Sequence, residues 1–174
     1  GLSGGEHVVA IVPLDGTIPL ALGTAQGVVK RVLPSEIAAR DEIEIISLKP
    51  HDAVVGGALA PDDAELLFVT DDAQLLRFDA SAVRAQGRAA GGMAGIRLGS
   101  GAAVIGFAVI PAMEAAEAVV VTAAGSAGAL AGADVSSGKV SPLSEFPPKG
   151  RATGGVRAHR LLKGEDRLVL SCAG

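Results

Sequence analysis

The sequence is poor in aromatic residues: it has no tryptophan, no tyrosine and only four phenylalanines among 174 residues. Aromatic boxes for cofactors and stacking platforms for unpaired bases are therefore poorly supplied. The single cysteine, Cys172, cannot form an internal disulfide, which favours a reducing compartment. No uninterrupted apolar run reaches the ~18–20 residues that cross a bilayer. The opening GLSGGEHVV has neither an initiator methionine nor a basic leader, so we expect a fragment of a longer chain.

Common catalytic and metal-binding motifs are also missing. There is no Walker loop, no Gly-x-Ser-x-Gly elbow and no Cys-x-x-Cys pair, and GSGAAVIG at 99–106 lacks the third glycine of a dinucleotide-binding turn. The three histidines lie far apart in the sequence. The aspartate pairs at 62–63 and 71–72 sit beside expected turns, where solvated carboxylates are commoner than metal ligands. We therefore predict no catalytic residue, no metal site and no cofactor in this chain.

The sequence does contain short apolar runs separated by turn residues. Nearly half of its residues are apolar, and 24 glycines and nine prolines imply many turns. Runs rich in valine, isoleucine and leucine read as strands, and none shows the spacing of an amphipathic helix. Residues 34–40 and 79–87 are expected to form a helical turn at most. The strand candidates are 7–14, 18–24, 28–33, 42–48, 53–60, 65–70, 74–79, 102–110, 117–122 and 167–172. An all-β fold follows.

The strand candidates recur in order. Thr24, Thr70 and Thr122 end similar runs and are 46 and then 52 residues apart, a period that suits a propeller-like blade of about four strands. We predict one domain over residues 1–174 with about three to four four-stranded blades. Its parts are leftover strands at about 1–15 and units at 16–60, 61–111 and 112–174. The serine- and proline-rich stretch 132–149 is expected to be a long loop or a repositioned connection between blades.

One phrase occurs twice: GRAAGGMAGIRL at 87–98 and GRATGGVRAHRL at 150–161 are identical at seven of twelve positions. We call these two segments the Gly-Arg phrases. The first unit has ARDEIEIISL in place of such a phrase. Glycines allow a turn without a Cβ clash, so one interpretation is a tight crossing between blades with solvated arginines. The other interpretation places the arginines at regular intervals along a rim, where they form a cationic surface.

The charge is unevenly distributed along the chain. The net charge of −4 argues against a strong polyanion binder. Residues 1–75 hold twelve acidic and four basic side chains, giving −8, whereas residues 76–174 hold seven acidic and eleven basic ones, giving +4. This asymmetry indicates a basic patch that faces an anionic partner.

The repeated segments resemble a known family. ELLFVTDDAQLLRFDASAVRAQGRAAGGMAGIRL, LALGTAQGVVKRVLPSEI and SEFPPKGRATGGVRAHRL are similar to the repeat of the C-terminal domain of bacterial type IIA topoisomerase A subunits, the DNA gyrase and topoisomerase IV family. The resemblance covers nearly the whole chain. It implies a β-pinwheel, a propeller-like disc of four-stranded blades that exchange strands with their neighbours. Its rim would bind and bend duplex DNA and present it to the catalytic core.

The resemblance also implies site residues and partners. The expected DNA-binding residues are basic: Lys30, Arg31, Arg77, Arg84, Arg88, Arg97, Lys149, Arg151, Arg157 and Arg160. Expected partners are duplex DNA, the topoisomerase B subunit, and the catalytic core of the same A subunit, with no membrane. Because this chain has no tyrosine, it cannot supply the DNA-cleaving nucleophile of the class. It would be a non-catalytic domain of an ATP-dependent isomerase, with ATP and Mg²⁺ held elsewhere, in the cytoplasm with the nucleoid.

The chain departs from the family pattern in several places. Ala73 replaces a glycine, GSAGALAG lacks the Lys-Arg pair, and the family's Gln-Arg-Arg-Gly-Gly-Lys-Gly box appears only as QGRAAGG and KGRATGG. There are also fewer units than the usual five or six. These departures favour a degenerate or topoisomerase IV-like member that binds DNA weakly. A propeller-like scaffold that binds proteins and has little affinity for DNA remains the alternative, and a blade-based enzyme is a third hypothesis that lacks any convergent catalytic group.

Overall fold

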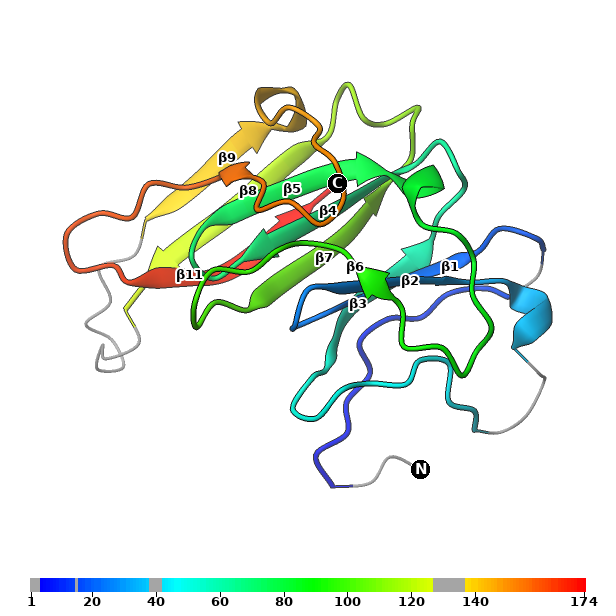
Figure 1. Ribbon diagram of the computed structural model, residues 1–174. Coiled ribbons are helices and arrows are strands. Elements are labelled where there is room, and N and C mark those ends of the chain that lie inside the picture. The colour runs from blue at the N-terminus through cyan, green and yellow to red at the C-terminus, as the bar shows by residue number, and fades with distance from the viewer. Residues whose placement is uncertain (1–3, 15, 38–41, 127–136) are drawn as a thin grey trace.

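The computed structural model describes residues 4–14, 16–37, 42–126 and 137–174, and its regular secondary structure consists almost entirely of strands (Figure 1). Three short 3-10 turns, η1 to η3, interrupt the strands at Pro34–Glu36, Ala80–Ala82 and Leu143–Glu145. The strands are β1 (Leu20–Thr24), β2 (Val28–Val32), β3 (Val54–Leu59), β4 (Glu65–Thr70), β5 (Gln74–Asp79), β6 (Met93–Ala94), β7 (Val104–Ile110), β8 (Val119–Gly125), β9 (Gly138–Pro142), β10 (Val156–Arg157) and β11 (Arg167–Ala173). The expected all-β class is confirmed.

The strands form three antiparallel sheets that follow one another along the chain. The first sheet has the order β3-β1-β2-β6, the second β10-β5-β4-β7 and the third β11-β8-β9. Two of these strands come from later in the sequence than their neighbours. β6 belongs to the phrase 87–98 yet pairs with β2, and β10 belongs to the phrase 150–161 yet pairs with β5. Each Gly-Arg phrase therefore supplies the outer strand of the preceding sheet, which is the strand exchange that the resemblance implied.

The sheets have a defined inner and outer edge. β3, β7 and β11 are edge strands of their sheets, and β7 contacts both β3 and β11. Glycines permit this approach, because a Cβ at Gly56 would lie 2.6 Å from the carbonyl oxygen of Phe107. β6 and β10 lie on the opposite edges, beyond β2 and β5. The Gly-Arg phrases consequently run along the outer rim of the arrangement.

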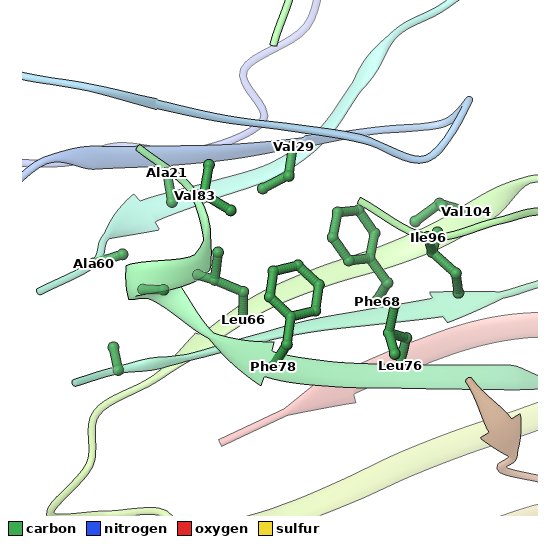
Figure 2. Packing of buried hydrophobic residues seen from close by; sticks show 12 residues of the cluster. Ala21, Val29, Ala60, Leu66, Phe68, Leu76, Phe78, Val83, Ile96 and Val104 are labelled. Atoms are coloured by element: carbon green, nitrogen blue, oxygen red, sulfur yellow. The ribbon is translucent and has the colours of Figure 1, made fainter. Parts of the chain in front are cut away.

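The hydrophobic core lies between successive sheets. Alternate side chains of a strand point to opposite faces, so a strand between two sheets must be apolar on both sides. Leu66, Phe68 and Phe78 of the second sheet face Ala21 and Val29 of the first (Figure 2). A second cluster, which includes Leu67, Leu75, Val120 and Leu168, joins the second and third sheets. Full burial of such side chains stabilises a fold by roughly 1.5–3 kcal/mol each.

The structure differs from the strand predictions in three regions. Residues 7–14 and 42–48 are apolar but form no strand, because their described backbone pairs with no neighbouring strand. The stretch 132–149, expected to be a loop, contains β9 and η3. Its remaining part up to residue 136 lies outside the described residues. The second strand of the third sheet was therefore missed, because the inserted segment separates it from β8.

The strand register corrects the alignment of the third unit. Leu20↔Val32, Leu66↔Phe78 and Val120↔Ser141 are equivalent pairs, since a 3-10 turn begins two residues after the second member in each case. On this register Leu22, Phe68 and Thr122 are equivalent. Thr122 therefore sits two residues before the position of Thr24 and Thr70.

Candidate nucleic-acid interface

The paired glycines of the phrases allow them to cross onto the preceding sheet. Gly92 and Gly155, the second glycine of each pair, have positive φ values of 85° and 72°. A Cβ at Gly92 would lie 2.8 Å from the carbonyl oxygen of Val29 and 2.6 Å from a methyl group of Val28. A Cβ at Gly155 would overlap the carbonyl of Leu75 in the same way. The glycines thus serve the tight crossing between sheets, which was one of the two interpretations of the phrase.

The two phrases also touch each other along the rim. The backbone N–H of Arg97 donates to Thr153 O at 3.0 Å, and that of Ala152 donates to Gly95 O at 2.6 Å. The Arg151 guanidinium donates to Ala94 O at 2.5 Å. Arg97 and Arg160 hold the same position in the two phrases and are 63 residues apart in the sequence. The contacts between the phrases place both arginines on one connected strip of backbone.

Lys30 is placed inside the molecule, which corrects its predicted surface role. Its side chain is fully buried, and Nζ donates to Ile45 O, Arg88 O and Ala90 O, each at 2.7 Å. Two of these acceptors belong to the phrase 87–98, so Lys30 ties that phrase to the first sheet. Burial lowers the pKa of Lys30 from its ordinary value, while the nearby Glu44 carboxylate acts in the opposite direction.

Arg31 and Arg77 are internal as well. Arg31 is 3% exposed and donates to the carbonyls of Ala60, Ala80 and Val83, with a 2.6 Å ion pair to Asp62. Arg77 lies at the equivalent position of the second sheet. It donates to Phe146 O at 2.5 Å and forms an ion pair with Glu65 at 2.7 Å. Each arginine therefore reaches the 3-10 turn of the following unit, and neither offers a free guanidinium to the solvent.

The remaining predicted cations lie on the rim. Arg151 is half-buried, and the other six are exposed and form no ion pair with any described residue. They come from the two phrases and the segments that lead into them. The six exposed residues are Arg84, Arg88, Arg97, Lys149, Arg157 and Arg160.

The rim is not basic throughout. Ser47 donates its N–H to Ala90 O, as Arg97 does to the equivalent Thr153 O, so the first unit has a serine where the others have Arg97 and Arg160. Exposed carboxylates, Glu42 and Glu44, occupy the same part of the first unit. The rim is therefore acidic at the first unit and basic along the two phrases, which gives a structural location for the charge asymmetry of the sequence.

A buried polar network was not foreseen in the third unit. His159 accepts or donates a hydrogen bond at 2.8 Å with Thr122 and at 3.0 Å with Ser137. Glu165 accepts from the backbone N–H groups of Leu162 and Ser137, and these hydrogen bonds lower the pKa of Glu165. His159 takes the place of Ile96 in the other phrase. The only sequence signal was this exchange of an apolar residue for a polar one.

Comparisons with known proteins agree with this architecture. The family model described as DNA gyrase C-terminal domain, beta-propeller, matches residues 64–111 and 137–170. The DNA gyrase A subunit of Deinococcus deserti is 33% identical over 171 residues, which cover 94% of this chain and 20% of that protein. This chain belongs to the DNA gyrase C-terminal domain family. The DNA gyrase A subunit of Escherichia coli K12 is 28% identical over 156 residues, which cover 87% of this chain and 16% of that protein. The chain thus spans about a fifth of these curated relatives.

Solved structures of the family share the fold. The crystal structure of the C-terminal domain of DNA topoisomerase IV matches with a TM-score of 0.76 and 26% identity, over 93% of this chain and 48% of that one. A DNA gyrase A C-terminal domain matches with a TM-score of 0.71 and 19% identity, over 93% of this chain and 50% of the other, and shows the fold alone. The predicted β-pinwheel is confirmed.

The described residues form neither a membrane-spanning helix nor a cluster of metal ligands. No helix in those ranges is long and apolar enough to cross a membrane. No group of three or more metal-binding side chains occurs there either. Of the aspartate pairs, Asp62 accepts from Arg31, and Asp71 accepts from the backbone N–H of Ala103 at 2.9 Å.

Proposed function

We propose that this chain is a non-catalytic DNA-binding part of a type IIA topoisomerase A subunit. The observation that carries the proposal is the strip of exposed cations along the two connected Gly-Arg phrases. Arginine and lysine that are free of carboxylates can neutralise backbone phosphates of a duplex. Lys30, Arg31 and Arg77 have no part in this surface, since none of them is exposed and each donates to backbone carbonyls inside the molecule.

The rim would bend as well as bind the duplex. The cations come from phrases on the outer edges of two successive sheets, so a duplex that contacts both must follow their arrangement. Phosphate contacts carry no base code, and any preference for sequence would come from the ease of bending. In the intact enzyme the domain would present this segment to the catalytic core of the same subunit for ATP-dependent strand passage.

The other parts of the proposal concern the whole enzyme. ATP and Mg²⁺ would be held by other domains or by the B subunit, and this domain would need no cofactor. The enzyme would work in the cytoplasm, associated with the nucleoid. The acidic first unit and the incomplete Gln-Arg-Arg-Gly-Gly-Lys-Gly box support a weak, topoisomerase IV-like mode of binding.

A charge-reversal experiment tests the rim. Arg97→Glu with Arg160→Glu changes the equivalent exposed position of both phrases. We expect duplex binding, measured by fluorescence anisotropy, to weaken by at least about tenfold and equally for two unrelated sequences, because phosphate contacts are lost. The matched control is Lys163→Glu with Arg167→Glu. This pair carries the same charge change at exposed positions outside both phrases, Arg167 being on β11.

The control should keep most of the affinity. An equal loss of duplex affinity in both double variants would show that the duplex responds only to the net charge of the protein. The rim would then have no special role in binding. Absence of duplex binding by the wild-type protein at low salt would favour the protein-binding scaffold.

A further inference from the structure

The junction between the first and second sheets differs from the junction between the second and third in how it holds an equivalent arginine. Arg31 on β2 and Arg77 on β5 have the same place in the strand register. Glu65, two residues before the strand partner of Arg77, binds that arginine through both carboxylate oxygens, at 2.7 and 3.0 Å. The residue two before the partner of Arg31 is Pro19, whose side chain has no acceptor. The first junction therefore lacks the carboxylate that the second one has.

A cavity lies at the first junction, beside the arginine that lacks this carboxylate. Its volume is about 550 Å³, and both Pro19 and Arg31 line it. Sites for small molecules commonly have volumes in this range. The exposed Arg84 lines the cavity as well, together with Thr17 and Ser81, whose hydroxyl groups can donate hydrogen bonds. The lining thus brings together two guanidinium groups and two hydroxyl groups, which are the donors that an oxyanion requires.

Arg31 also has a donor that nothing accepts. Its two terminal nitrogens donate to three backbone carbonyls and to Asp62, whereas Nε is buried and has no acceptor among the described residues. Nε of the equivalent Arg77 donates to Phe146 O at 2.5 Å. Buried donors nearly always have a partner, so the unmet Nε indicates that an acceptor belongs beside it.

The charge of the cavity favours an anion. Asp62 is the one acidic side chain among the described residues that line it, against the two cations Arg31 and Arg84. The Asp62 side chain is 79% exposed, so water screens its charge. Arg31, in contrast, is 3% exposed, and a buried cation interacts strongly with a nearby anion.

We propose that this cavity binds a small oxyanion, a phosphate or carboxylate group, which stands beside Arg31 as Glu65 stands beside Arg77. Arg84 would bind the same group by charge-assisted hydrogen bonds. The apolar lining residues Ile18 and Leu33 would contact the body of an organic ligand. This site goes beyond the proposed function, because its ligand is a small molecule and its lining includes no residue of the two Gly-Arg phrases.

Two simple anions supply the direct test. Inorganic phosphate and succinate are titrated separately into the ¹⁵N-labelled protein at constant ionic strength, with chloride as the balancing anion. We expect saturable shifts of the amide NMR signals of Ser81, Arg84 and Ala85, which line the cavity. Tighter binding of phosphate would assign a phosphorylated ligand to the cavity, and tighter binding of succinate would assign a ligand with a carboxylate.

Pro19→Glu supplies from within the chain the carboxylate that the cavity lacks. It should weaken the binding of either anion by at least about tenfold, because the new carboxylate competes for Arg31 and repels the ligand. The matched control is Pro142→Glu, at an exposed proline of β9 outside the cavity, and it should leave the affinity unchanged.

A second variant alters an exposed position, so its effect does not depend on repacking of the junction. Arg84→Gln should weaken anion binding by about tenfold through the loss of a charged donor, and Lys163→Gln, at an exposed lysine outside the cavity, should not.

Three results would overturn the proposal. The first is the absence of saturable shifts with both anions, and the second is equal anion affinity of the wild type and Pro19→Glu. The third is an equal loss in Arg84→Gln and Lys163→Gln, which would mean that the anions respond only to net charge. None of these measurements includes DNA, so a failure of this proposal is distinct from a failure of the proposed function.

Discussion

The basic residues of this chain divide into two groups by their position in the strands. Neighbouring residues of β2 point to opposite faces, and both faces of this strand are covered. Lys30 and Arg31 are therefore both enclosed, and each donates to backbone carbonyls of the following unit. Cations in the phrases lie on or beside the outer strand of a sheet, and all of them except the half-buried Arg151 are exposed. Position, and not residue type, decides which cations can meet a partner.

The first residue-scale prediction concerns the pH dependence of Lys30. Burial lowers the pKa of Lys30 below 10.5, so the unfolded chain binds its proton more tightly than the folded one does. As pH rises from the folded pKa toward 10.5, the contribution of Lys30 to stability must increase. We expect the free energy of unfolding of the wild type, relative to Lys30→Met, to rise through this alkaline window in denaturant titrations.

Lys49→Met, at an exposed lysine, is the control and should show no such trend. A difference between wild type and Lys30→Met that falls as pH rises would mean that the carbonyl cage favours the charged form more than burial disfavours it.

The sequence could identify the basic residues but could not show which of them are buried and which are exposed. The Lys-Arg pair at 30–31 follows a turn and resembles a surface pair, and only the stacking of sheets on both faces shows that it is internal. By contrast, the exposed arginines of the phrases could be selected because the phrase itself is repeated.

At the scale of elements, each Gly-Arg phrase joins two sheets, because it follows one sheet in the sequence and pairs with the preceding sheet. The second glycine of each pair, Gly92 or Gly155, has a positive φ and lies against the backbone of the preceding sheet. Its replacement therefore destabilises the fold in two ways: the new residue must adopt a left-handed backbone, and its Cβ meets the neighbouring strand. We expect Gly155→Ala to destabilise the fold by more than about 2 kcal/mol, since left-handed backbone alone costs about 1–2 kcal/mol for a residue with a Cβ. Thermal or denaturant unfolding measures this loss.

Gly164→Ala is the matched control, because Gly164 also has a positive φ, of 96°, but a Cβ there would meet no atom within 4 Å. It should show only the cost of the backbone conformation. Equal effects of the two substitutions would mean that the approach of the phrase to Leu75 is not tight.

The elements themselves could be predicted where the repeat is regular. Apolar runs flanked by turns located β1 to β5 and β7 closely, and the two expected helical turns are η1 and η2. Residues 7–14 and 42–48 are similarly apolar, and Val12 and Ile45 pack against side chains of β1 and β2, but their backbone pairs with no strand. Pairing and not propensity therefore determines their state. The two-residue strands β6 and β10 could not be predicted, because their pairing depends on contacts with the preceding unit.

At the scale of the whole molecule, the described residues form three successive sheets, and the chain matches about half of the topoisomerase IV and gyrase A C-terminal domains compared above. Its rim changes from acidic at the first unit to basic along the two phrases. A net charge of −4 therefore does not describe the surface that would meet DNA. A duplex should lie along the two Gly-Arg phrases, on the outer edges of the first and second sheets, and avoid the exposed carboxylates of residues 42–44.

The salt dependence of duplex binding tests this account most directly. The logarithm of the association constant, measured by anisotropy for a duplex over a range of salt concentrations, should fall linearly with the logarithm of salt. Each phosphate contact contributes about −0.9 to this slope, so removal of Arg97 and Arg160 should make it shallower by nearly two. A wild-type affinity that does not change with salt, or an unchanged slope in the double variant, would contradict the account.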